Sequence, residues 1–96
     1  MNTEIRGVHY EIMDVDKELI DKKLSRLHFA DGDIIDAHFT IVKEKKRFKT
    51  EAMIHFRWGH RIFLHVNDFD LHHGIDQLFS KMEVRIGKEK DRVKGR

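Results

Sequence analysis

The sequence predicts an α+β fold in which two helices cover one face of a four-stranded sheet. Apolar and polar residues alternate over three central segments, as they do in strands that bury one face. Two other segments repeat apolar residues at three- and four-residue steps, which is the period of a helix that buries one stripe. An antiparallel sheet that is wet on one side must cover its other face with both helices, so we expect a two-layer sandwich.

Length and composition indicate one small globular domain. The chain has 96 residues, of which 40% are hydrophobic and 38% charged, so we expect a single domain over residues 1–96. Its apolar runs all fall short of the roughly 20 residues of a membrane span. The first residues lack a signal-peptide pattern and the sequence has no cysteine, so we expect a cytoplasmic protein.

The first third of the chain predicts a strand and a helix. A short strand is expected over residues 3–9, where Gly7 indicates a bulge or a close backbone approach. A helix is expected over residues 14–28, with aspartates at its start and cations at its end, as the helix dipole favours. Its apolar positions are Val15, Leu19, Ile20, Leu24 and Leu27. An Asp-Gly-Asp turn at residues 31–33 ends it.

Three strands follow in two hairpins. They are expected over residues 35–41, 48–56 and 62–66. A highly charged connection over residues 43–47 joins the first pair, and Trp58 and Gly59 join the second. We place His38, Glu51, His55 and His65 on the open face of the sheet. The predicted order of elements is β-α-β-β-β-α.

The last helix is expected over residues 70–96, with Asp70 as its N-cap. Its apolar stripe contains Ile75, Leu78, Phe79, Met82, Ile86 and Val93. A second stripe lies about 100° around the cylinder and contains Lys81, Arg85, Lys88 and Arg92. One stripe therefore faces the core, while the other faces a partner or solvent.

Positive charge is concentrated at the end of the chain. Residues 81–96 hold seven lysines and arginines against three acidic residues, whereas residues 1–80 hold twelve basic and fourteen acidic residues. Concentrated cations bind phosphates by releasing condensed counterions, so this distribution favours a polyanionic partner. The alternative is an ordinary solvated helix face.

Several segments, in their order and spacing, resemble the ribosome hibernation promoting factors and the related ribosome-associated inhibitor. These segments are Glu4–Tyr10, Lys22–Leu27, Val42–Lys45, Ala52–His55, Asp70–Asp76 and Lys81–Met82. The resemblance implies a fold like a double-stranded-RNA-binding domain and a non-enzymatic role on the small ribosomal subunit in stress or stationary phase. There the protein would occupy the channel of mRNA and the A- and P-site tRNAs. Because the sequence ends at Arg96, it resembles the family's short form.

Three basic groups are expected to contact rRNA, which proteins recognise mostly through phosphates, 2′-hydroxyls and shape. The first-helix cations are Lys22, Lys23 and Arg26. The hairpin cations are Lys43, Lys45, Lys46, Arg47 and Lys49. The stripe cations are Lys81, Arg85, Lys88 and Arg92, with Lys90 and Lys94 beside them. For each group the alternative is a solvated surface. We expect the free protein to be a monomer without a cofactor.

The sequence departs from the usual family pattern at four positions. His72 stands where an aromatic residue is common, and His73 stands where a small residue is common. Met13 stands where a serine or threonine cap is common. Gly87 interrupts the last helix at a cost of about 1 kcal/mol relative to alanine. We therefore expect the helix to bend or fray at Gly87, which puts in doubt the reach of the cations beyond it.

Other functions are less well supported by the residues. The eight histidines lack the HxxxH and HExxH spacings of metal sites, so we expect no bound metal. The aspartates at 31, 33 and 36 lack the distal glutamate of an EF-hand. Trp58 either stacks on a base or folds back on the sheet edge. A generic structured-RNA-binding domain remains the main alternative, and an enzyme would need a pocket with perturbed titratable groups.

Overall fold

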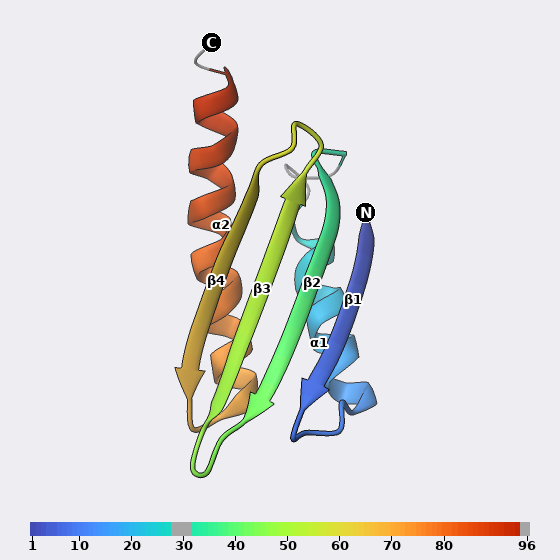
Figure 1. Cartoon of the computed structure of the whole chain (residues 1–96), viewed down its shortest axis with the longest axis vertical. Helices are drawn as coiled ribbons and strands as arrows, with labels where there is room; N and C mark the ends of the chain where they lie inside the picture. The colour runs from blue at the N-terminus through green and yellow to red at the C-terminus, as the bar shows by residue number, and fades with distance from the viewer. Residues whose placement is uncertain (28–31, 95–96) are drawn as a thin grey trace.

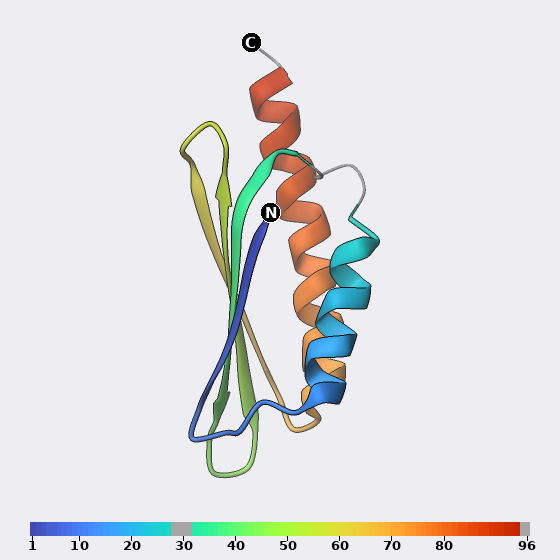
Figure 2. The same ribbon diagram turned by 90° about the vertical axis from the view of Figure 1, so that its right-hand side faces the viewer.

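A computed structural model describes residues 1–27 and 32–94 and confirms the predicted fold class. The elements are β1 (Asn2–Val8), α1 (Asp14–Ser25), β2 (Ile34–Lys43), β3 (Phe48–Phe56), β4 (Arg61–Asp68) and α2 (Leu71–Lys94). Both helices lie on the same face of the sheet, which leaves the other face open (Figures 1 and 2). The order of elements and the two-layer sandwich are as predicted.

The sheet is mixed, with strand order β1-β2-β3-β4. The pairs β2–β3 and β3–β4 are antiparallel, as the two predicted hairpins require. The prediction of a wholly antiparallel sheet is wrong for β1, which runs parallel to β2. After β1 the chain returns along the sheet as α1, so β2 starts from the same end as β1 (Figure 1).

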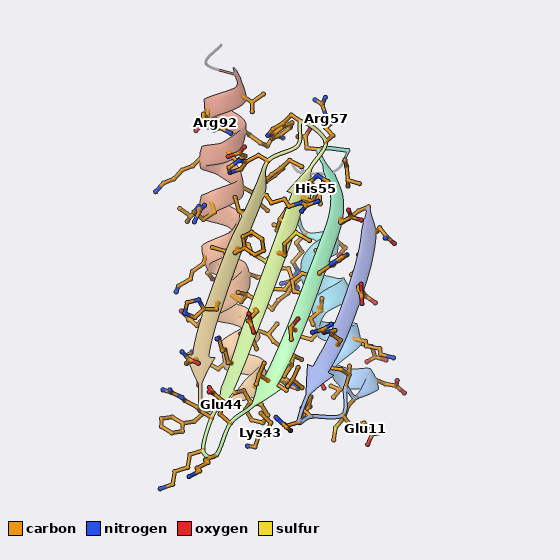
Figure 3. The ribbon with its side chains drawn as sticks, viewed as in Figure 1. Glu11, Lys43, Glu44, His55, Arg57 and Arg92 are labelled. Carbon is orange, nitrogen blue, oxygen red and sulfur yellow. The ribbon has the colours of Figure 1, made fainter. Side chains whose placement is uncertain are left out.

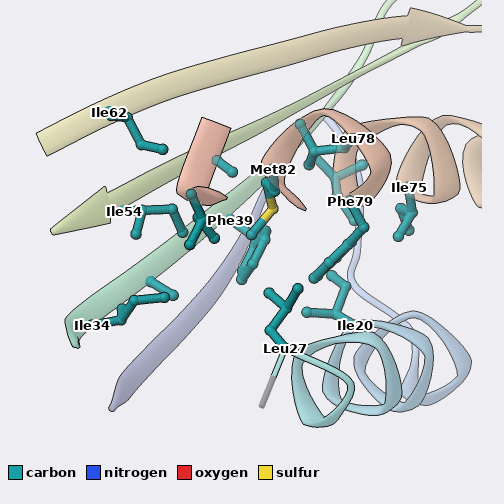
Figure 4. Packing of buried hydrophobic residues seen from close by; sticks show 14 of the residues in the cluster. Ile20, Leu27, Ile34, Phe39, Ile54, Ile62, Ile75, Leu78, Phe79 and Met82 are labelled. Atoms are coloured by element: carbon teal, nitrogen blue, oxygen red, sulfur yellow. The ribbon is translucent and has the colours of Figure 1, made fainter. Parts of the chain in front are cut away.

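The core lies between the sheet and the two helices (Figure 4). From Ala37 onward the strands contribute alternate residues to it, as the sequence predicts. At the start of β2 the prediction that Ile35 faces inward is wrong, because an irregularity in the pairing between Ile34 and Asp36 buries Ile34 and leaves Ile35 44% exposed. The buried apolar strand residues are Ile34, Ala37, Phe39, Ile41, Ala52, Ile54, Phe56 and Ile62. The α2 residues that cover them are Leu71, Ile75, Leu78, Phe79, Met82 and Ile86. The Phe39 and Phe79 rings stack with their centroids 5.5 Å apart and so join sheet and helix directly.

The region around α1 differs from the prediction at the end of the helix. The helix ends at Ser25, with Arg26 as its C-cap, and so is shorter than expected. The predicted helix end at His28 and the turn residue Asp31 lie outside the described residues. At Gly7, a Cβ atom would overlap the carbonyl oxygen of Tyr10, so the predicted close backbone approach is confirmed.

The long helix α2 has the predicted N-cap and continues past Gly87. Asp70 is the N-cap, because its Oδ1 accepts a hydrogen bond from the His73 N–H at 3.1 Å. The helix is unbroken through Gly87 up to Lys94, so the expected fraying at this glycine does not occur. Buried Ile86 and Glu89 on either side of Gly87 hold this turn against the sheet. The predicted helix end at Arg96 lies outside the described residues.

Candidate nucleic-acid interface

The stripe cations lie along the flank of α2 that borders the edge strand β4. All four are exposed, and Lys81 Nζ donates to the carbonyl oxygen of His65 on β4 at 3.4 Å. From Lys81 to Arg92 the helix rises about 17 Å at 1.5 Å per residue. The predicted cationic stripe is therefore a solvent-facing row of charges on a rigid element.

Not every predicted cation of α2 belongs to this row. Lys90 lies on the opposite flank, where its Nζ is 3.1 Å from Asp33 Oδ2. Arg92 donates to Glu89 Oε1 at 2.7 Å. Within the described residues, Arg85 and Lys88 have no carboxylate partner. The side chain of Lys94 lies outside what the structure describes.

The first-helix cations also divide into exposed residues and a residue that pairs with a carboxylate. Lys22 and Arg26 are exposed, whereas Lys23 is half-buried and forms an ion pair with Asp76 of α2. This ion pair joins the two helices across their contact. Lys22 and Arg26 therefore face solvent, and Lys23 joins the two helices.

The hairpin cations lie at the opposite end of the molecule from the end of α2. Figure 3 shows Lys43 at one end of the sheet and Arg92 at the other. Lys43 Nζ lies 4.1 Å from the centroid of the Phe48 ring, and Arg47 pairs with Glu44 at 3.6 Å. Lys45 and Lys46 are exposed at the tip. The three basic groups thus form separate surfaces and do not merge into a single patch.

A buried carboxylate, Glu89, organises the end of the molecule near Arg92. Besides Arg92, it accepts a hydrogen bond from Trp58 Nε1 at 2.9 Å, and His60 Nε2 is 3.8 Å away. The hydrogen bond from Arg92 is the largest cause that lowers the pKa of Glu89. The Trp58 ring stacks on Phe56 at 5.0 Å, so of the two alternatives for Trp58 the structure shows the folded-back one.

A second buried carboxylate, Asp16, lies where the two helices begin. Its Oδ2 accepts hydrogen bonds from the Tyr10 hydroxyl at 2.6 Å and the Met13 N–H at 3.0 Å, and His72 Nε2 is 3.2 Å from its Oδ1. Burial acts to raise the pKa of Asp16, but these three hydrogen bonds outweigh burial and lower it. Burial and the bond to Asp16 raise the pKa of Tyr10 to about 12.

The open face of the sheet carries the predicted histidines and Glu51. His55 Nδ1 lies 3.2 Å from Asp36 Oδ2, and this contact is the largest cause that lowers the pKa of Asp36. Asp33 instead pairs with Arg57 and Lys90. Over residues 1–27 and 32–94, no three histidine, aspartate or glutamate side chains lie close enough together to hold a metal ion.

Comparison with known proteins identifies the family. The profile of the Sigma 54 modulation protein / S30EA ribosomal protein family matches residues 3–94. The chain belongs to this family. The resemblance to ribosome hibernation factors is thereby confirmed, and so is the assignment to a class of ribosome-associated factors.

Two solved structures are similar to this member of the S30EA family. A ribosomal subunit interface protein from Coxiella burnetii has 24% sequence identity and a TM-score of 0.88, and the match covers 94% of this chain and 98% of that one. The N-terminal domain of Protein Y from Thermus thermophilus has 26% identity and a TM-score of 0.81, with 92% and 98% covered. Comparison with curated proteins finds no match.

In this S30EA family member, sequence reasoning located the exposed cations and missed the buried carboxylates. Glu89 follows Ile86 by three residues and Met82 by seven, so its place on the apolar stripe was a readable signal of burial. Asp16 gave no such signal on an apolar stripe, because its partners come from two other segments, the connection between β1 and α1 and the start of α2. Neither described helix is apolar enough over a sufficient length to cross a membrane.

Proposed function

We propose that residues 1–96 act as a single domain that binds the small ribosomal subunit and holds the ribosome inactive in the cytoplasm, without catalysing a reaction. The site would be the channel of mRNA and of the A- and P-site tRNAs. Membership of a ribosome-associated family supports the partner. The row of exposed cations on α2 supports rRNA as the surface bound.

The observation that carries this proposal is the flank formed by Lys81, Arg85 and Lys88. These side chains are exposed on a helix that the core holds rigid, so they meet phosphates without a cost of ordering the backbone. We propose that the direct contacts to rRNA come from Lys22, Arg26, Lys43, Lys45, Lys81, Arg85 and Lys88. Lys23, Lys90 and Arg92 each pair with a carboxylate and so contribute mainly by positioning.

The first experiment measures co-sedimentation of the purified protein with small ribosomal subunits and its effect on translation in vitro. Binding together with inhibition is the expected result. Failure to co-sediment at low salt would contradict the proposal. Equal affinity for plain duplex RNA and for small subunits would instead indicate a generic structured-RNA-binding domain.

A salt titration tests whether phosphate contacts dominate. The logarithm of the affinity should fall linearly with the logarithm of the monovalent salt concentration, with a slope that reflects several released counterions. Magnesium is held constant, because the ribosome itself depends on it. A nearly flat line would contradict the electrostatic account.

Charge reversal tests the stripe itself. The variant K81E/R85E/K88E should keep a native circular dichroism spectrum, because these residues lie off the core face, and its affinity should fall by orders of magnitude. Arg92 is left unchanged because it satisfies the buried Glu89.

The matched control for this variant is R6E/K17E/R61E, which changes three exposed cations elsewhere and alters the net charge equally. The affinity of this control variant for the small subunit should stay close to that of the wild type. Equal losses in the two variants would mean that overall charge alone matters.

A further inference from the structure

The turn between β4 and α2 presents an aromatic ring to solvent. Phe69 is 77% exposed and is the most exposed large hydrophobic residue of the described chain. We propose that Phe69 stacks on an unpaired base of small-subunit rRNA, whose phosphates the neighbouring hairpin cations bind. This inference rests on the proposed function and adds to it a contact with a base.

The strand register places Phe69 beside the cationic hairpin. Phe48 pairs with Asp68 at the end of the β3–β4 ladder. The next residues outward are Arg47 and Phe69, so both leave the sheet at the same end. Figures 1 and 2 both show the β2–β3 hairpin and the β4–α2 turn at this end.

Hydrogen bonds fix the backbone on both sides of Phe69. Asp68 Oδ1 accepts from the Asp70 N–H at 2.9 Å, and the Asp70 carbonyl accepts from the Gly74 N–H at 2.9 Å. With Asp70 also capping α2, the turn has little freedom. The backbone that carries the ring is therefore ordered before any partner arrives, which lowers the entropic cost of binding.

The charges around the ring favour a polyanion. The hairpin carries five cations against the single carboxylate of Glu44, which pairs with Arg47. Asp68 and Asp70 flank Phe69, but Asp68 pairs with His73 and Asp70 faces the positive end of α2. Asp68 also raises the pKa of His73, which favours the cation that balances its charge.

An exposed aromatic ring beside cations is the combination that binds unpaired nucleotides. The ring stacks on the base while the cations hold the phosphates, and stacking tolerates any base because every base has a π-face. Duplex RNA keeps its bases stacked inside the helix, so the ring selects an unpaired position. The stripe on α2 has no such ring among its four members and is suited to phosphates alone.

The test measures the affinity of salt-washed small subunits for Phe69 variants across a salt titration. F69A should bind roughly 5- to 150-fold more weakly than the wild type, because stacking on one base contributes about that much. The slope of affinity against salt should stay unchanged, since no phosphate contact is lost. F69Y and F69W should bind as well as the wild type, and F69L should bind as weakly as F69A.

A matched control separates this effect from a general loss of apolar surface. Phe63 is 71% exposed on the open face of the sheet, away from the hairpin tip. F63A should therefore bind like the wild type, and all variants should keep native circular dichroism spectra.

The possible outcomes separate the inference from the proposed function. Wild-type affinity in F69A would overturn the inference alone, provided that the wild type binds. Full binding by F69L would also overturn it, because it would indicate an apolar contact with a ribosomal protein. Absence of binding by the wild type would overturn the proposed function and this inference together.

Discussion

At the scale of single residues, the two buried carboxylates determine how the elements are joined. Asp16 links the segment after β1 to the starts of both helices, and Glu89 links the β3–β4 hairpin to α2. Burying a charge costs free energy unless hydrogen bonds and opposite charges compensate. Here they do, since no buried side-chain nitrogen or oxygen in the described residues lacks a partner.

Replacing Asp16 by alanine should destabilise the protein strongly. D16A leaves the Tyr10 hydroxyl and the Met13 N–H without an acceptor, which we expect to cost about 2–4 kcal/mol in the free energy of unfolding. Urea unfolding followed by circular dichroism measures the change. D14A removes an exposed carboxylate from the same helix turn and should cost less than about 1 kcal/mol. Similar losses in the two variants would contradict the role of the Asp16 hydrogen bonds.

Glu89 makes the stability depend on pH in acid. Its pKa in the folded state is lowered by Arg92 and Trp58, below the usual value of about 4.5. The unfolded state therefore binds the proton more readily, and the stability that Glu89 contributes above pH 4.5 is lost as the pH falls through its folded pKa. E89Q lacks this titration, so the wild type should lose more stability than E89Q between pH 7 and about pH 3. If urea unfolding shows that the wild type and E89Q lose equal stability over this range, Glu89 is not the source of the pH dependence.

At the scale of elements, three sides of α2 make different contacts. One side covers the sheet, and the flank beside β4 carries the stripe cations. On the opposite flank, Asp76 and Lys90 form ion pairs with residues of other segments. The first two sides were predictable because each is a periodic pattern within one helix. The third was not, because the partners Lys23 and Asp33 lie far away along the chain and only the fold brings them close.

For the strands too, patterns within one element were predictable, whereas their arrangement relative to other elements was harder to predict. Alternation over residues 48–56 predicted both ends of β3, because a strand with one buried face has a two-residue period that the sequence displays. The direction of β1 could not be predicted from its own residues, since its short and mostly exposed pattern is the same for parallel and antiparallel pairing, although the predicted helix between the first two strands favours a parallel pair. Only the crossover through α1 decides it.

The two glycines at positions 7 and 87 should respond in opposite ways to alanine. A Cβ at Gly87 would meet no atom within 4 Å, so G87A should stabilise the helix by about 0.5–1 kcal/mol. A Cβ at Gly7 would overlap the Tyr10 carbonyl, so G7A should destabilise the protein. Thermal unfolding of both variants measures these changes. A destabilised G87A would mean that α2 needs glycine at this turn.

At the scale of the whole molecule, the protein is an elongated sandwich of about 45 × 20 × 20 Å. Its basic groups are distributed over both ends and one flank. This distribution suits a body that lies within a walled channel of RNA, where several surfaces are in contact at once. It also explains why no single motif in the sequence reveals the function.

We expect the free protein to be a monomer at micromolar concentration, measured by light scattering. Apart from Val15, which is exposed, the apolar stripes of both helices are turned into one core, and the open sheet face is largely polar. Phe63 is the main apolar side chain exposed there. A stable dimer would contradict this prediction and would point to that face, in which case F63S should restore the monomer.

The parallel pairing of β1 has a consequence for how the molecule opens. The strands β2, β3 and β4 follow one another through short turns, whereas β1 meets β2 only after the whole of α1 has been placed between them. Closing that longer loop costs more entropy, and β1 has a neighbour on one side only. The β1 amides should therefore exchange with deuterium faster than those of β3, by sub-global openings in which β1 detaches while the three-stranded meander stays folded.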